Sequence, residues 1–184
     1  SLTTTIAAGF NGEEFLHVKT NRGVGKGAAG ILEQSSLEKI SRWIPYSLPH
    51  EMVSDYIYNK QAYPTSIPVT PESIAIEQAL ATQALRLSIK EISPEFPYLP
   101  NTPSDPQVLP WLEPIIATGN VIARAPNLAQ ALLILLNGIQ PSGITTIAVD
   151  QNNLTAALGA AARVNPVLAV QVIETSTYLN LGTI

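Results

Sequence analysis

The hydrophobic pattern predicts an N-terminal β-hairpin followed, much later in the chain, by two buried strands. Residues 2–10 and 13–20 form the hairpin, because Asn11-Gly12 between them is the strongest short signal for such a turn. Residues 114–118 and 144–149 are short apolar runs without alternation, which is typical of strands covered on both faces. We therefore expect an α/β domain with one mixed sheet, in which the hairpin joins two parallel strands.

Three helices are predicted between the hairpin and the buried strands. The first begins at a capping-box pattern, Ser35 with Glu38 three residues later, and ends at Pro45. The second covers residues 50–59, and the third covers residues 70–92 with a Thr-Pro-Glu start that is typical of an N-cap. The positions expected to face inward are Leu37, Ile40, Ile44, Met52, Val53, Tyr56, Ile57, Ile76, Leu80, Ala84 and Leu87.

Two further helices accompany the buried strands. A helix over residues 127–137, closed by Gly138, would connect these strands by a right-handed crossover. Leu154–Ala162 predicts an alanine-rich helix, whose Gly159 and Ala160 would permit close packing. The apolar face of the crossover helix is expected at Leu128, Ala131, Leu132, Leu135 and Leu136.

Residues 45–110, which contain the second and third of the helices predicted after the hairpin, are expected to form a largely helical insertion. The whole chain, residues 1–184, is expected to be a single domain. Six prolines lie between Pro94 and Pro110, so this insertion should end in an extended loop. The chain starts within an apolar strand and stops on apolar residues. We interpret both ends as lying within a longer protein.

The composition indicates which classes of molecule are expected to bind this chain. Apolar residues make up 46% of the chain and charged residues 13%, about half of the roughly 25% that is usual. Either a missing domain or partner covers part of the surface, or this is simply a mildly acidic domain. With a net charge of −4 and no block of Lys or Arg, nucleic acid is not an expected partner. Apolar stretches such as 128–136 are too short to span a membrane, and the lack of Cys fits a cytoplasmic protein.

Two features of the sequence suggest a phosphate loop and a histidine-based site, but neither has the residues that such a site requires. Gly23–Gly27 resembles a phosphate loop, but Thr20 stands where its first glycine is needed and Gly27 where Ser or Thr is needed. His17 and His50 belong to different predicted elements without acids at ligand spacing, so neither a metal site nor a Ser-His triad is expected. His17 is interpreted as a half-exposed residue at a strand edge. No catalytic or metal-binding residue is assigned.

Two short stretches remain as candidate binding sites. Thr3-Thr4-Thr5 would bring hydroxyl and backbone N–H groups together as a phosphate cradle, although β-branched residues are also ordinary in a strand. Thr118-Gly119-Asn120 follows a buried strand, and its glycine would let a ligand approach the backbone. A plain strand-to-helix turn would have the same composition.

Several stretches of the chain resemble the glutamate mutase L family, accessory proteins of cobalamin-dependent carbon-skeleton mutases within the actin-like ATPase superfamily. They are "RWIPYSLPHEMVSDYIYNKQAYPTSIP", "IEQALATQALRLSI", "LLILLNGIQPSGITTIAVDQNNLTAALGAAA" and "LNLGTI". The resemblance implies a ribonuclease H-like half-domain from the C-terminal half of such a protein. It also implies phosphate contacts from Ser1, Thr3, Thr4 and Thr5, and adenosine contacts from Thr118, Gly119, Asn120 and Arg124.

The same resemblance implies ATP and magnesium in the full-length protein and weak or no ATP binding by this fragment. The Asp-x-Gly expected in the phosphate hairpin would precede Ser1, and Asn120 stands where a second glycine is usual. The implied partners are the N-terminal half of the same protein and a cobalamin-dependent mutase, without nucleic acid or membrane. The function is then an ATPase-type reactivase; the alternative is a degenerate actin-like domain that only binds protein. A small-molecule kinase has less support, because no acceptor-binding acid or base is evident.

Overall fold

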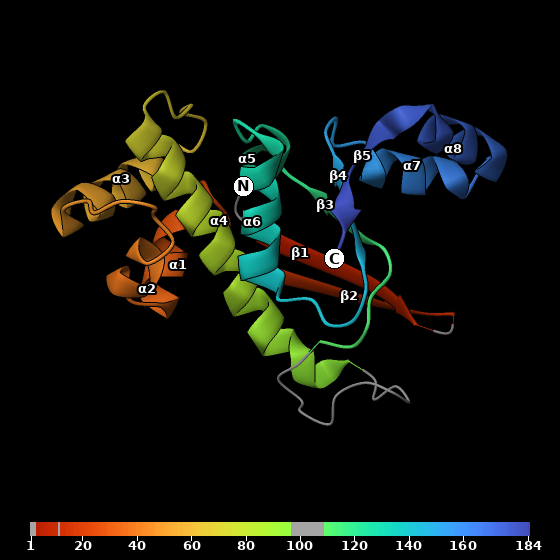
Figure 1. Ribbon diagram of the computed structural model, residues 1–184, viewed down its shortest axis with the longest axis horizontal. Coiled ribbons are helices and arrows are strands. Elements are labelled where there is room, and N and C mark those ends of the chain that lie inside the picture. Colours follow the sequence, from red (N-terminus) through yellow and green to blue (C-terminus); the bar gives the residue numbers. More distant parts are fainter. Residues whose placement is uncertain (1–2, 11, 97–108) are drawn as a thin grey trace.

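The computed structural model describes residues 3–10, 12–96 and 109–184, which form an α/β arrangement of two small sheets and surrounding helices (Figure 1). In chain order the elements are β1 (Thr3–Phe10), β2 (Glu13–Thr20), α1 (Ala28–Gln34), α2 (Leu37–Ser41), α3 (His50–Ala62), α4 (Pro71–Ile92), η1 (Ser93–Glu95), β3 (Ile115–Thr118), α5 (Asn120–Ala123), α6 (Leu128–Ile139), β4 (Thr146–Asp150), α7 (Thr155–Ala162), α8 (Pro166–Val172), η2 (Ile173–Thr177) and β5 (Tyr178–Thr183).

The predicted hairpin is confirmed. β1 and β2 pair antiparallel from Thr3 opposite Thr20 to Phe10 opposite Glu13, and Gly12 in the turn has a φ of 86°. Asn11 lies outside the described residues. Phe10 and Phe15 contact Phe96 edge-to-face, which attaches the hairpin to the chain after α4.

The second sheet contains the predicted parallel pair. β3 pairs parallel with β4, and the chain between them passes through α5 and α6, so the crossover by a helix is confirmed. β5 adds an antiparallel strand on the other side of β4, which makes this sheet mixed. β5 was not predicted. Its glycine, Gly182, has a φ of 136°, and the pairing with β4 is irregular between Ile147 and Ala148.

The prediction of one sheet that includes the hairpin is wrong, because within the described residues β1 pairs only with β2. The hairpin is held by α4 instead. Glu91 of α4 accepts Lys19 Nζ at 2.7 Å and Arg22 Nη2 at 2.5 Å, and these two cations come from β2 and the residues after it. A hollow of about 640 Å³ lies between β1 and the segment containing β3. We call this hollow the β1–β3 slot.

Helix α4 is the central element of the molecule (Figure 1). Thr70 is its N-cap as predicted, and its capping partner is the side chain of Ser73. On one side α4 packs against α1, α2 and α3, and on the other side against α6. At the latter contact a Cβ on Gly138 would lie 2.8 Å from Leu85 Cβ, so the two helices approach closely.

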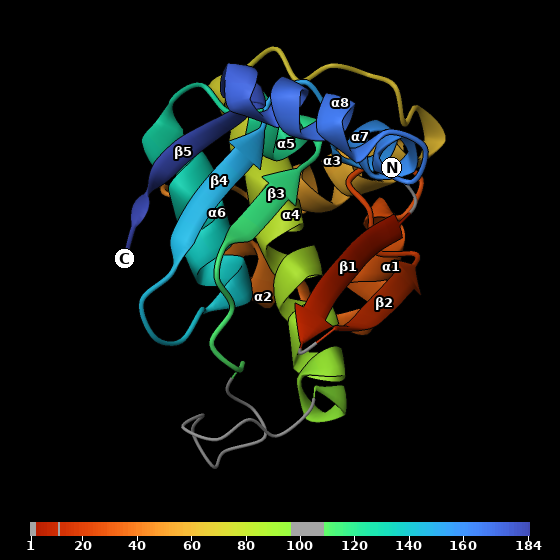
Figure 2. The ribbon, with the colours of Figure 1, turned by 90° about the vertical axis from the view of Figure 1, so that its right-hand side faces the viewer.

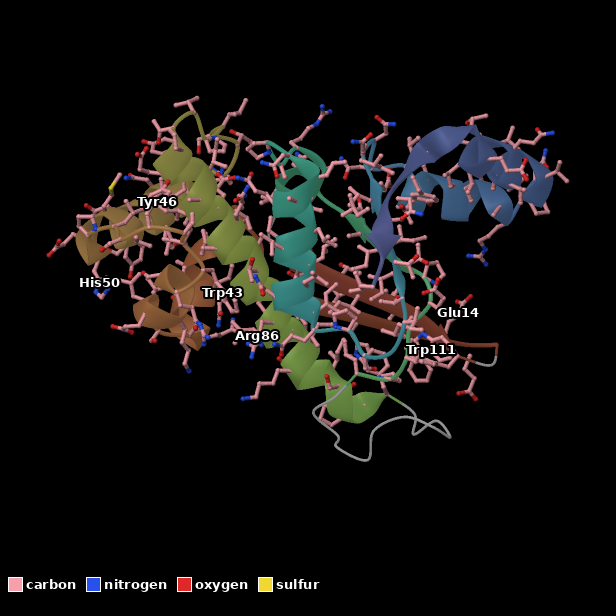
Figure 3. All side chains as sticks on the ribbon, viewed as in Figure 1. Glu14, Trp43, Tyr46, His50, Arg86 and Trp111 are labelled. Atoms are coloured by element: carbon pink, nitrogen blue, oxygen red, sulfur yellow. The ribbon has the colours of Figure 1, made fainter. Side chains whose placement is uncertain are left out.

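Between α2 and α4 the contacts are polar as well as apolar (Figure 3). Trp43 Nε1 donates to Gln83 Oε1 at 2.9 Å, and the Arg86 guanidinium lies 5.8 Å from the Trp43 ring centre. The insertion predicted at residues 45–110 is thus helical in α3 and α4 and belongs to the main core. Residues 97–108 of its proline loop lie outside the described residues.

Several local predictions are corrected. Helix α2 is capped at Ser36 without a side-chain hydrogen bond, so Ser35 and Glu38 form no capping box. Met52 is 44% exposed, because it lies on the outer side of α3 beside the buried Val53. Gly138 lies inside α6, and the left-handed residue that ends this helix is Gln140.

Three further predictions need correction. Ile144 is exposed, and its strand begins two residues later at Thr146. Gly159 and Ala160 are exposed, and a Cβ on Gly159 would meet nothing within 4 Å, so they permit no close packing here. The His17 side chain is only 16% exposed, since its Nδ1 lies 3.3 Å from Glu95 Oε2 and its ring packs near Phe96. Among the described helices, none is both long and apolar enough to cross a membrane.

Candidate functional site

The candidate site is a polar turn at the carboxyl ends of β3 and β4. Thr118 ends β3 directly opposite Asp150, which ends β4. The chain after β3 turns at Gly119 into α5, and the chain after β4 passes Asn153 before α7. Loops that follow adjacent parallel strands lie at the same edge of the sheet, where α/β proteins commonly bind ligands.

Asn153 joins the two loops through its side-chain amide. Its Oδ1 accepts the Thr118 hydroxyl at 2.7 Å and the Gly119 N–H at 3.0 Å, and its Nδ2 donates to Asn120 Oδ1 at 3.2 Å. We call these four residues, Thr118, Gly119, Asn120 and Asn153, the turn cluster. The cluster is a continuous set of hydrogen bonds at the surface of the molecule.

The backbone at Gly119 requires glycine. Its φ is 119° and its ψ is 143°, a region that L-residues with a side chain rarely adopt. A Cβ there would meet nothing within 4 Å, so open space remains above the turn. Asn120 is the first residue of α5 and has no positive φ. The single glycine is therefore sufficient for this turn, and a second glycine is not needed at Asn120.

Asp150 anchors the second loop from below the surface. The residue is fully buried, and its Oδ2 accepts the Thr155 N–H at 2.7 Å and the Thr155 hydroxyl at 2.6 Å, while its Oδ1 accepts the Asn152 N–H at 3.2 Å. Burial disfavours the ionised form, but these hydrogen bonds outweigh it and hold the pKa of Asp150 below its usual value. Asp150 is thus a structural carboxylate that orients the loop carrying Asn153.

The predicted phosphate residues are only partly brought to this site. Thr5 and Thr118 both line the β1–β3 slot, so the slot connects the hairpin to the turn cluster. The Thr4 hydroxyl donates to the Arg22 carbonyl, so it supports the loop after β2. Thr3 begins β1 but does not line the slot, and Ser1 lies outside the described residues.

The last predicted adenosine contact, Arg124, lies at the C-terminal end of α5. Its backbone N–H donates to the Asn120 carbonyl at 2.9 Å, and its side chain is exposed. The backbone of Arg124 therefore lies one helical turn after Asn120, at the end of α5 away from the turn cluster.

The turn cluster suits a neutral polar ligand group better than a metal ion. Threonine hydroxyl and asparagine amide groups can hydrogen-bond a ribose or a base. Magnesium prefers oxygen ligands that include a carboxylate, and both oxygens of Asp150 are already engaged within the chain. Throughout the described part of the chain, no group of three His, Cys, Asp or Glu side chains is placed to hold a metal ion.

The sequence predicted three of the four residues of the turn cluster; it did not predict the fourth, Asn153, or Asp150 beneath it. A signal was available, because Asp150 directly follows a buried apolar strand and Asn153 comes three residues later. Polar residues at the ends of two parallel strands are expected to meet. Asn153 has a φ of 55°, a backbone state that asparagine tolerates better than most residues.

Comparisons with known proteins give one match. Nothing among curated proteins or solved structures matches the chain. A family model described as MutL protein matches residues 6–177, which include all four residues of the turn cluster and every strand except β5 and the first three residues of β1. The resemblance seen in the sequence is thereby confirmed, and the chain belongs to the glutamate mutase L family.

Proposed function

We propose that this chain is the C-terminal nucleotide-cleft domain of an ATPase-type accessory protein that reactivates a cobalamin-dependent mutase. The mutase partner follows from membership in the glutamate mutase L family. The actin-like relationship, the reactivase activity and a cytoplasmic location are parts of the same proposal. The chain would supply one wall of the cleft, and the N-terminal half of the longer protein would supply the other.

The observation that supports this proposal best is the position of the turn cluster. It lies at the carboxyl ends of two parallel strands, where Gly119 leaves open space above the backbone. Thr5 and Thr118 line one common slot, so a nucleotide on the turn would also lie near the hairpin. In this proposal the turn cluster contacts the adenosine, and magnesium is held by groups outside residues 1–184.

The cluster would act by binding and orientation alone. Thr118 and the two asparagines, which hydrogen-bond one another here, would exchange these bonds for bonds to the nucleoside, and Gly119 would let it approach the backbone. Bound ATP would supply the free energy for moving the two halves of the protein relative to each other. That movement would release damaged cobalamin from the mutase.

The proposal is tested by recovery of an inactivated glutamate mutase in the presence of the full-length protein. We expect recovery to require ATP and magnesium, and Gly119→Ala to lower its rate by roughly tenfold, because the turn conformation costs about 1–2 kcal/mol with a Cβ. The matched control is Gly159→Ala in α7, where a Cβ meets nothing within 4 Å and recovery should be unchanged. Equal recovery without ATP would refute the ATPase part of the proposal.

A second candidate function, a protein-binding module without nucleotide, is favoured by two observations. Asn153 already takes the Thr118 hydroxyl and the Gly119 N–H, which a nucleotide would otherwise use. In α8 and its flanks, Val164, Val167, Leu168, Val170 and Ile173 are all exposed. Recovery of the mutase that is independent of ATP but lost on Val167→Glu would support this second function.

A further inference from the structure

Helices α7 and α8 form a pair at the surface with little of it buried. They lie on the opposite side of the molecule from α3 (Figure 1), and Figure 2 looks onto that side, where no described element passes in front of α8. Of the described side chains of the two helices, only Leu158 and Ala169 are buried. The helices have eight and seven residues, and helices this short are stable only when they are packed. This pair therefore needs a further packing partner.

One side of α8 and the residue turn after it presents a regular face to solvent. Val167, Val170, Gln171 and Glu174 follow one another at i, i+3, i+4 and i+7, so their side chains lie on one face, and all four are exposed. We call these four residues the α8 face. Val167 is 62% exposed and Val170 is 52% exposed, whereas Ala169 on the other side of the helix is buried. The apolar middle of the α8 face is thus turned away from its own chain.

The two charges of this region have opposite signs and lie at opposite ends of α8. Arg163 lies two residues before Asn165, the N-cap of the helix. Glu174 lies two residues after Val172, the last residue of the helix, and the residues between the two charges carry none. Among the described residues, neither Arg163 nor Glu174 forms an ion pair. Glu174 also lies near the C-terminal end of the helix, where the helix dipole disfavours an acid.

This arrangement of charges is complementary to itself. In an antiparallel pair of α8 helices related by a two-fold axis, each end of one helix lies against the opposite end of the other. The register that places Arg163 opposite Glu174 of the second copy also places Val167 opposite Val170 of the second copy, because the numbers of facing residues have a constant sum. Glu174 then lies beside the N-terminal end of the other helix, where an acid is favoured. Parallel packing would instead oppose like charges at both ends.

We propose that the α8 face binds the α8 face of a second copy of this protein, antiparallel and with two-fold symmetry. The helical segment 166–177 of α8 and η2 is a rod roughly 18 Å long and about 10 Å wide with its side chains. A contact of this size buries less than the roughly 1,200 Å² at which standard stable interfaces begin. The dimer is therefore weak and depends on protein concentration. The proposal does not rest on the proposed function, because neither nucleotide nor mutase takes part.

The test is sedimentation equilibrium of the longer protein, without nucleotide, between about 1 and 500 μM. We expect a reversible equilibrium between monomer and dimer. Val167→Asp should weaken dimerisation about hundredfold or more, because the two-fold axis brings a carboxylate into the apolar contact twice. The matched control is Val69→Asp in the loop before α4, where the valine is 85% exposed and lies outside the α8 face, so dimerisation should be unchanged.

Two results of this experiment would overturn the proposal. One is a longer protein that stays monomeric at every concentration, whether another part of its chain covers the α8 face or the face is left for the mutase. The other is a dimer that Val167→Asp leaves as strong as in the wild type. Circular dichroism of each variant checks that it folds.

A charge reversal tests the antiparallel register directly. Arg163→Glu alone opposes two acids at both ends of the dimer, and Glu174→Arg alone opposes two cations, so each variant should dimerise about tenfold more weakly. An equimolar mixture of the two variants restores an opposite pair at both ends. It should therefore form a heterodimer with a dissociation constant close to that of the wild type. A mixture that associates no better than the separate variants would overturn the proposal.

Discussion

Asn153 is the residue on which the geometry of the candidate site depends most directly. Asn153→Ala removes three hydrogen bonds and leaves an alanine at a φ of 55°, so we expect a loss of about 2–3 kcal/mol of unfolding free energy. Asn153→Asp keeps the acceptor for Thr118 and Gly119 and should lose less than half as much. Thermal unfolding of the three proteins measures the difference. Equal losses for the two variants would show that these acceptor contacts carry no stability.

Asp150 makes the free energy of unfolding depend on pH in the acid range. The pKa of this carboxyl is lower in the folded than in the unfolded protein, so the folded state favours the ionised form. The resulting stability is fully present above the ordinary value of about 3.9 and is lost as the pH falls through the lower folded pKa. Asp150→Asn should cost about 1–3 kcal/mol at neutral pH, because the contacts of Thr155 are weakened.

The check is the melting temperature of both proteins between pH 6 and pH 2. The wild type should lose stability more steeply with acid than Asp150→Asn, since the variant has no group to protonate there. Glu91 and Glu113, whose pKa values are also lowered by hydrogen bonds, titrate equally in both proteins and so cancel in the comparison. If the melting temperatures of the two proteins fall equally with decreasing pH, the role given to Asp150 is contradicted.

At the scale of elements, α3 is joined to α4 by a buried ion pair. Lys60 Nζ lies 2.5 Å from Glu77 Oε1, both side chains are more than nine-tenths buried, and the Tyr56 hydroxyl donates to the same Glu77 oxygen at 2.9 Å. Lys60→Met should therefore cost about 3–5 kcal/mol, because it leaves Glu77 as a buried and unpaired charge. The double variant Lys60→Met with Glu77→Leu should recover most of that loss. Chemical denaturation measures both, and equal destabilisation of the single and double variants would contradict this explanation.

The elements that were predicted correctly have signals that do not depend on distant contacts. The cap at Thr70 and the apolar stripe of α4 are local, as are the unalternating runs of β3 and β4. β5 has weak local signals, and it is a strand because β4 offers it an edge. The separation of the hairpin from the second sheet also depends on distant contacts, namely those of Glu91 and Phe96.

The predictions for the candidate site show the same difference between local signals and contacts of distant residues. Thr118, Gly119 and Asn120 were predicted because a small-residue turn after a buried strand is visible in the sequence. Asn153 was missed because its role comes from the pairing of β3 with β4, which places it 35 residues along the chain but within hydrogen-bond distance of Thr118. The predicted cradle of Thr3, Thr4 and Thr5 reaches the slot only through Thr5, since the fold uses the Thr4 hydroxyl to hold the Arg22 carbonyl.

At the scale of the whole molecule, the chain has two sheets on either side of a slot and a pair of outer helices with little charge. Residues 151–184 contain only Arg163 and Glu174 as charged residues, and the apolar side chains of α8 are largely exposed. Patches of this kind commonly mark interaction surfaces. Both features agree with a domain that works against other parts of a longer protein or against a partner.

The central claim is that this chain supplies one wall of a nucleotide cleft and too few contacts to bind ATP alone. Loss of one charge-assisted contact costs about 1.5–3 kcal/mol, or one to two decades of affinity, and loss of a whole wall costs more. The most direct measurement is calorimetric titration of ATP, with and without magnesium, into residues 1–184 and into the longer protein. We predict magnesium-dependent binding by the longer protein and weak or no binding by residues 1–184. Tight, magnesium-dependent binding by residues 1–184 alone, or no binding by the longer protein, would contradict the claim.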